Sequence, residues 1–224
     1  MIKAVIFDLD DTLISERRYI ESGYKHISKL LSEKLQKDEQ ELYQLLMDFF
    51  NENTRNVFNR IFDRFGISYT QNEIMELVEE YRNHTPIIQF FEDVLPCLKN
   101  LRAKGINVGI ITDGYAKAQR QKLEAVKAID YFDEIIVTDE LGREYWKPHH
   151  KPFEIMREKL NVEFSEMIYI GDNPQKDFYI SCIYPIQTVR IHRNGVYKNS
   201  NYLNNIKENH SIYCLNELDV VFEK

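Results

Sequence analysis

The chain has 224 residues, of which 43% are hydrophobic and 29% are charged, and its formal net charge at pH 7 is −7. This composition indicates a folded globular protein rather than a disordered or fibrous one. The acidic balance argues against a nucleic-acid partner, because binding to a phosphate backbone usually needs a basic face. The length suits one domain of ordinary size with a smaller inserted module.

The three cysteines, Cys97, Cys182 and Cys214, are widely spaced and fit neither a metal-ligand pattern nor a disulfide framework. We expect all three to be reduced. The apolar N-terminal stretch is interrupted by Asp8 and Asp10, so it does not resemble a signal peptide. No later run approaches the roughly 18 apolar residues that span a bilayer. The expected location is the cytoplasm, with no membrane partner.

Short apolar runs predict buried strands, in chain order, with helical segments between the later ones. The runs are mostly continuous rather than alternating, which is typical of a parallel sheet covered by helices on both faces. Strands alternating with helices predict an open, doubly wound α/β sheet. The predicted strands are Ala4 to Phe7, Val108 to Ile111, Ile135 to Val137, Met167 to Ile170 and Thr188 to Ile191, with a final strand near Ile212 to Leu215.

A long insertion lies between the first two strands and has helical periodicity with almost no strand signal. Its apolar residues recur every three or four positions, which predicts about four amphipathic helices. We place the catalytic core at residues 1–14 and 92–224 and the inserted helical module at residues 15–91. The module is either a lid over the active site or a plain helical bundle without a catalytic role.

Polar residues follow the predicted strands at the points where ligands bind. In an open parallel sheet these points lie beyond the carboxyl ends of the strands. The candidate site residues are Asp8, Asp10 and Thr12 after the first strand, Thr112, Asp113 and Gly114 after the second, Lys147 before the helix that follows the third, and Gly171, Asp172 and Asp177 after the fourth.

Four of these acids, Asp8, Asp10, Asp172 and Asp177, would converge on one pocket. Several carboxylates a few ångströms apart cannot all stay ionised without a counter-charge. Carboxylate and backbone oxygens with retained waters suit Mg²⁺, so a magnesium site is expected. Gly171 would allow the backbone to turn tightly beside the metal.

The four clusters resemble, in order, the four motifs of the haloacid dehalogenase superfamily. Asp8-Leu9-Asp10-Asp11-Thr12 resembles the first motif, Thr112 the second, Lys147 the third, and Gly171-Asp172 through Asp177 the fourth. A single DxDxT pattern would be weak evidence, but four ordered motifs at strand ends are specific. The resemblance implies a Mg²⁺-dependent phosphatase with a Rossmann-like core and a C1-type cap.

The resemblance also implies a role for each residue. Asp8 would be the nucleophile that is transiently phosphorylated, and Asp10 would be the acid and base. Mg²⁺ would be bound by the Asp8 carboxylate, the Asp10 backbone carbonyl and the Asp172 carboxylate, while Asp177 would orient metal-bound water or support the ligands from behind. The substrate phosphate would be bound by Thr112, the backbone N–H groups of Asp113 and Gly114, and Lys147.

The third motif contains two lysines and two adjacent histidines. We choose Lys147 over Lys151 as the motif lysine, because the family lysine stands six residues before an aromatic residue, here Phe153. We interpret His149 and His150 as loop residues, since adjacent histidines do not share a face and no third ligand is evident.

The second motif departs from the family, because Asp113 stands where asparagine is frequent. An additional carboxylate near the phosphate would repel it. Only the backbone N–H is needed at this position, so we expect the Asp113 side chain to turn outward.

Other functions remain open within and outside the resemblance. The second acid, Asp10, disfavours a dehalogenase, but a phosphomutase of the β-phosphoglucomutase type retains both aspartates. A non-catalytic binding protein with the same fold is the other alternative. For a phosphatase, the expected substrate is a small phosphorylated metabolite, either a sugar phosphate or a nucleoside monophosphate, and the expected state is a monomer or homodimer.

Overall fold

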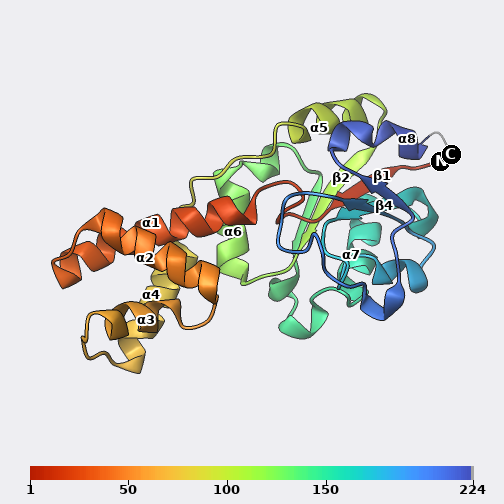
Figure 1. The fold of residues 1–224 in the computed structure, drawn as a ribbon. Helices are drawn as coiled ribbons and strands as arrows, with labels where there is room; N and C mark the ends of the chain where they lie inside the picture. The colour runs from red at the N-terminus through yellow and green to blue at the C-terminus, as the bar shows by residue number, and fades with distance from the viewer. Residues whose placement is uncertain (223–224) are drawn as a thin grey trace. The chain divides into compact units, whose positions relative to one another are not determined.

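The chain forms two compact units in the computed structural model, which describes residues 1–222 (Figure 1). The first, here the sheet unit, comprises residues 1–16 and the described residues from 88 onward. The second, here the helical unit, comprises Arg17–Ile87. Among residues 1–222, no helix combines the length and the apolar character that crossing a bilayer requires.

The sheet unit is built on six parallel strands in the order β3-β2-β1-β4-β5-β6. This arrangement confirms the predicted doubly wound α/β fold. The last strand lies slightly earlier than predicted, and Leu215 instead begins a short 3₁₀ turn, Leu215–Glu217. The strands are β1 (Ala4–Phe7), β2 (Asn107–Thr112), β3 (Glu134–Val137), β4 (Met167–Gly171), β5 (Gln187–Ile191) and β6 (His210–Ile212).

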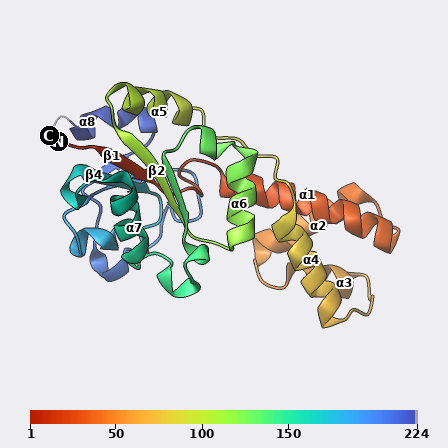
Figure 2. The same ribbon diagram turned by 180° about the vertical axis from the view of Figure 1, so that it is seen from behind.

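Helices cover both faces of the sheet, which explains why its strands are apolar on both sides. On β1, Val5 and Phe7 face one hydrophobic cluster, whereas Ala4 and Ile6 face another, as the alternation of side chains along a strand requires. All four residues are fully buried. Figures 1 and 2 place α5 and α8 on one side of the sheet and α7 on the other. The helices of this unit are α5 (Val94–Ala103), α6 (Ala116–Ala125), α7 (Lys151–Leu160) and α8 (Asp219–Phe222).

The register of the central strands aligns their carboxyl ends. Phe7 at the end of β1 pairs with Ile110 of β2 on one side and with Ile170 of β4 on the other. The backbone N–H of the next residue, Asp8, donates to the Ile170 carbonyl at 2.8 Å. The strand order reverses direction between β1 and β4, and this is where ligands bind in open α/β sheets.

The helical unit consists of four helices with a hydrophobic core of their own, as the sequence periodicity predicts. Buried residues from all four helices pack together, among them Ile27, Leu46, Phe62 and Leu77. Each helix buries one stripe and leaves the opposite face in solvent. The helices are α1 (Glu16–Leu35), α2 (Glu39–Glu52), α3 (Val57–Arg64) and α4 (Gln71–Asn83).

The start of α4 is fixed by a capping box. The Thr70 hydroxyl accepts a hydrogen bond from the Glu73 N–H at 3.3 Å, and the Glu73 carboxylate accepts one from the Thr70 N–H at 2.9 Å. These bonds satisfy backbone donors that have no partner inside the helix. The Lys34 ammonium and the Thr70 N–H lower the pKa of Glu73 to about 2, so this carboxylate is ionised at neutral pH.

We predict that Thr70→Ala weakens the helical unit, because the first turn of α4 loses its side-chain cap. The free energy of opening at the α4 amides, measured by native-state hydrogen exchange, should fall by about 1 kcal/mol. Glu79→Ala on the exposed face of the same helix is the control and should leave this value unchanged. Equal protection in Thr70→Ala and the unmodified protein would contradict the proposed cap.

Candidate active site

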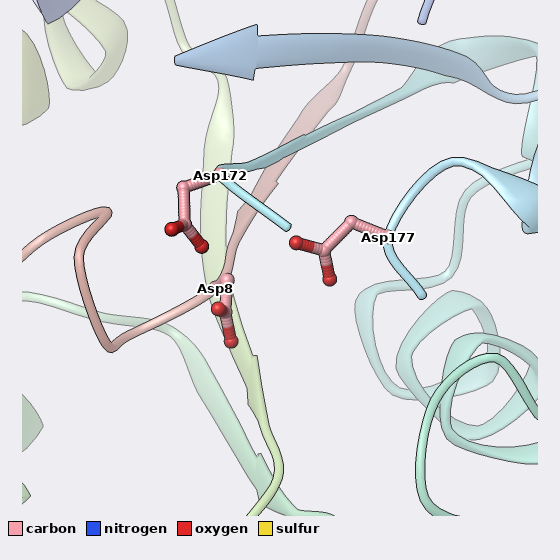
Figure 3. Close-up of side chains that lie close together, drawn as sticks. All are labelled: Asp8, Asp172 and Asp177. Carbon is pink, nitrogen blue, oxygen red and sulfur yellow. The ribbon is translucent and has the colours of Figure 1, made fainter. Parts of the chain in front are cut away.

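Three buried aspartates meet at the carboxyl ends of β1 and β4. Asp8 directly follows β1, Asp172 directly follows β4, and Asp177 lies in the turn after β4. A carboxylate oxygen from each lies within 4.8 Å of those of the other two. Figure 3 shows the three side chains gathered in this way. The chain thus brings three hard oxygen ligands from three positions in the sequence to one point.

Lys147 is the buried cation of this cluster. Its ammonium donates to Asp8 Oδ1 at 2.7 Å, to Asp177 Oδ1 at 2.9 Å and to the Tyr169 hydroxyl at 2.6 Å. All three ammonium protons therefore have acceptors. Lys151, the alternative motif lysine, instead begins α7 at the surface and pairs with Glu154 at 3.5 Å.

The cluster carries more negative charge than one lysine can neutralise. Burial raises the pKa of Asp8 to about 6, although Lys147 opposes the shift. Burial, Asp177 and Asp8 together raise the pKa of Asp172 to about 9. Conversely, burial disfavours the charge on Lys147, but Asp177, Asp8 and Asp113 raise its pKa above the ordinary value. A divalent cation among these oxygens would relieve the repulsion, and an all-carboxylate donor set suits Mg²⁺.

Gly171 makes room for Asp177, and this differs from the tight turn that we expected from the sequence. A Cβ atom at position 171 would lie 2.3 Å from Asp177 Oδ2 and 2.6 Å from its Cγ. Asp177 is in turn held by the Asn173 N–H, which donates to Oδ2 at 2.9 Å, and by the Tyr169 hydroxyl at 3.2 Å. The absence of a side chain at position 171 is thus a packing requirement of the Asp177 carboxylate.

Asp113 does not turn outward, which corrects the expectation from the sequence. Its carboxylate is buried and accepts from the Thr138 hydroxyl at 2.8 Å, the Lys147 N–H at 3.0 Å and the Lys176 ammonium at 3.0 Å. Burial disfavours ionisation, but Lys147 and Lys176 outweigh it and hold the pKa of Asp113 below its usual value. The inward side chain is tolerated because Lys176, a residue that the sequence did not single out, neutralises it.

Asp10 does not belong to the group of three carboxylates, although the sequence predicts that four acids converge, and two residues of α6 hold its carboxylate. Lys122 forms an ion pair with Asp10 at 2.8 Å, and the Gln119 side-chain amide donates to it at 3.0 Å. The same amide donates to the hydroxyl of Thr112 at 2.6 Å. Sequence reasoning missed Lys122 and Gln119. Their spacing of three residues on a helix that follows the second motif was the available signal.

His149 and His150 lie apart from the aspartates. Their rings stack on each other with centroids 4.5 Å apart. The one group of potential metal ligands found in residues 1–222 is the aspartate cluster, to which neither histidine belongs.

Comparisons with known proteins place this geometry in a family context. The family model described as "Haloacid dehalogenase-like hydrolase" matches residues 5–189. A glyceraldehyde 3-phosphate phosphatase from Methanopyrus kandleri is 32% identical over 86% of this chain and 85% of its own length. One from Methanocaldococcus jannaschii is 27% identical over 97% of this chain and 94% of its own length.

A further relative and a solved structure are also similar to this chain. Pyrophosphatase PpaX from Bacillus cereus is 26% identical over 77% of this chain and 75% of its own length. The crystal structure of a phosphatase of the same family from Thermococcus onnurineus matches with a TM-score of 0.63 and 29% identity, covering 99% of this chain and 98% of that one.

We predict that Gly171→Ala destabilises the sheet unit, because the new methyl group would displace a buried, hydrogen-bonded carboxylate. The free energy of unfolding in urea should fall by about 2 kcal/mol, as for overpacked cores. Gly109→Ala on β2 is the matched control. Its methyl group would mainly meet the flexible end of Met156, so a smaller loss is expected. Equal losses in the two variants would be inconsistent with a special role for Gly171.

Proposed function

The chain belongs to the haloacid dehalogenase-like hydrolases and is a phosphatase, and we propose that it hydrolyses a small phosphomonoester through an aspartyl-phosphate at Asp8 with Mg²⁺. The family inferred from the four motifs is thereby confirmed. The observation that carries the mechanism is the position of Asp8. It directly follows the central strand β1 and lies against two further acids and the Lys147 ammonium.

The donor set supports Mg²⁺ as the cofactor. We propose the Asp8 carboxylate, the Asp10 backbone carbonyl and the Asp172 carboxylate as its ligands, with Asp177 orienting water and neighbouring groups. When bound, the cation would neutralise charge on the aspartates and on the substrate phosphate. Without it, a phosphate dianion would approach a cluster of acids in which Lys147 pairs with Asp8 and Asp177 only, and repulsion would oppose binding.

Asp8 and Asp10 divide the chemistry between them. An Asp8 carboxylate oxygen would attack phosphorus as the bond to the leaving oxygen breaks, and Asp10 would donate a proton to that oxygen. Asp10 would then take a proton from the water that attacks the aspartyl-phosphate, which releases inorganic phosphate and restores Asp8. Each residue thus returns to its starting state after one turnover.

The remaining motif residues would bind the transferring phosphoryl group. Thr112 and the backbone N–H groups of Asp113 and Gly114 follow β2, the strand next to β1. Fixed donors of this kind stabilise charge that develops in the transition state. We propose that Lys147 keeps Asp8 in its attacking orientation, since the two are joined at 2.7 Å inside the protein.

We propose a small phosphorylated metabolite as the substrate and residues 15–91 as a cap that excludes water during the reaction. The relatives named for glyceraldehyde 3-phosphate and for pyrophosphate support a small substrate. A first panel should therefore contain a triose phosphate and pyrophosphate beside the sugar phosphates and nucleoside monophosphates expected from the sequence. The ratio kcat/KM would rank them.

We predict that Asp8→Asn abolishes phosphate release, because an amide cannot serve as the nucleophile. With Mg²⁺ and p-nitrophenyl phosphate, kcat should fall by more than about 10⁴-fold, the scale seen when a nucleophile is removed. Asp130→Asn, which changes an exposed aspartate of the same unit, is the control and should retain full activity. Substantial turnover by purified Asp8→Asn would rule out the proposed nucleophile.

A further inference from the structure

The Asp10 carboxylate accepts hydrogen bonds from two residues of α6, a helix more than a hundred residues further along the chain. Lys122 Nζ lies 2.8 Å from both carboxylate oxygens, and Gln119 Nε2 lies 3.0 Å from Oδ2. Both donors are on α6, spaced so that they share one helix face. Asp10 itself lies in a tight turn after β1, where Leu13 N–H bonds back to the Leu9 carbonyl at 2.9 Å.

The two donors are buried, and removing their polar groups from water costs free energy that an exposed contact would not require. The Lys122 side chain is 5% exposed and Gln119 is 2% exposed. A buried ammonium is stable only with a charged or strongly polar partner, and Asp10 provides one. The Asp10 side chain keeps 20% of its surface exposed, so the clamped carboxylate still has an accessible side.

Gln119 also connects Asp10 to the second motif, which comprises Thr112, Asp113 and Gly114. The two N–H groups of the Gln119 amide reach Asp10 and the Thr112 hydroxyl, and the latter bond is 2.6 Å long. Gly114 adopts a φ of +134°, and a Cβ atom there would lie 3.0 Å from the Gln119 amide carbon. The glycine therefore provides the space in which Gln119 links the acid after β1 to the hydroxyl after β2.

We propose that Lys122 and Gln119 are positioning residues that fix the Asp10 carboxylate for proton transfer to the leaving group. This inference rests on the proposed function of Asp10 and extends it to two residues of α6. In the step concerned, Asp10 starts protonated. The bond between phosphorus and the leaving oxygen breaks as the bond to Asp8 forms, and the Asp10 proton moves to the leaving oxygen, which leaves the carboxylate that Lys122 and Gln119 contact. A misplaced Asp10 would slow this step most when the leaving oxygen is strongly basic.

A purely structural role for Lys122 predicts something different. Burial raises the pKa values of Asp11 and Glu16, and the Lys122 charge opposes both shifts. If neutralising these acids were its whole contribution, loss of Lys122 would lower activity equally for all phosphomonoesters. The dependence of the loss on the leaving group therefore separates the two roles.

The test compares an alkyl phosphate, whose leaving group needs a proton, with dinitrophenyl phosphate, whose leaving group does not. The ratio kcat/KM is the appropriate quantity, because it reports the steps up to transfer of the phosphoryl group to Asp8. In Lys122→Met it should fall at least about tenfold for the alkyl ester and less than about threefold for the aryl ester, since a general acid contributes about 10²–10⁴-fold. Lys122→Arg, which keeps the charge and the donors, should recover part of the loss.

Two variants and one control keep the result interpretable. Gln119→Leu should have the same leaving-group dependence at smaller size, and it provides the answer if Lys122→Met fails to fold. Lys117→Met, on the exposed face of α6, should match the unmodified protein. Inhibition by inorganic phosphate should change little in Lys122→Met, because the phosphate-binding groups and the bond between Gln119 and Thr112 are retained.

Asp10→Asn distinguishes failure of this inference from failure of the proposed function. If Asp10→Asn has the leaving-group dependence but Lys122→Met and Gln119→Leu do not, the positioning role is wrong and the role of Asp10 stands. If Asp10→Asn loses activity equally on both esters, or loses none, the proton-transfer role of Asp10 is wrong and the positioning role falls with it. Equal losses on both esters in Lys122→Met would likewise overturn the proposal.

Discussion

The contact between the Lys147 ammonium and the carboxylates of Asp8 and Asp177 is the interaction on which the rest of the site depends. All three side chains are almost completely inaccessible to solvent. Removing one partner from a buried ion pair is strongly destabilising, because the charge that remains is uncompensated. Asp172 adds a third carboxylate with no equivalent lysine of its own, and its pKa rises to about 9 mainly because it is buried. Without a cation, the repulsion among the three carboxylates is therefore only partly compensated.

The parallel sheet is what makes this concentration of charge possible. Strands that are mainly apolar and buried lie on both sides of β1 and hold its carboxyl end in register with that of β4, so Asp8 and Asp172 follow neighbouring strands side by side. Specific neighbouring residues make this crowding of carboxylates possible. Gly171 gives up its side chain to Asp177, and Lys176 neutralises Asp113. The Asp10 carboxylate is held from α6 in the same manner, by donors on a regular element rather than on a loop.

The sequence was informative where a residue's position follows from the element before it. Asp8, Thr112 and Asp172 each end or follow an apolar strand, and parallel strands align such residues whatever the details of packing. Their placement, and the fold itself, could therefore be predicted, although the roles assigned to these residues remain predictions. Lys122 and Gln119 could not be found in this way, because a helix periodicity does not reveal which distant loop a polar residue will meet. The inward side chain of Asp113 was missed for a related reason, because its charge was weighed without Lys176, which pairs with it at 3.0 Å.

The most direct test of the central claim is the binding of Mg²⁺ itself, measured by isothermal titration calorimetry on the metal-free protein. One Mg²⁺ per chain is expected, with an affinity at least about tenfold weaker in Asp172→Asn, since even supporting groups around a metal contribute about 10- to 100-fold. Asp130→Asn should bind as the unmodified protein does. Absence of Mg²⁺ binding, or equal affinity in Asp172→Asn, would contradict the claim that the three aspartates form a cation site.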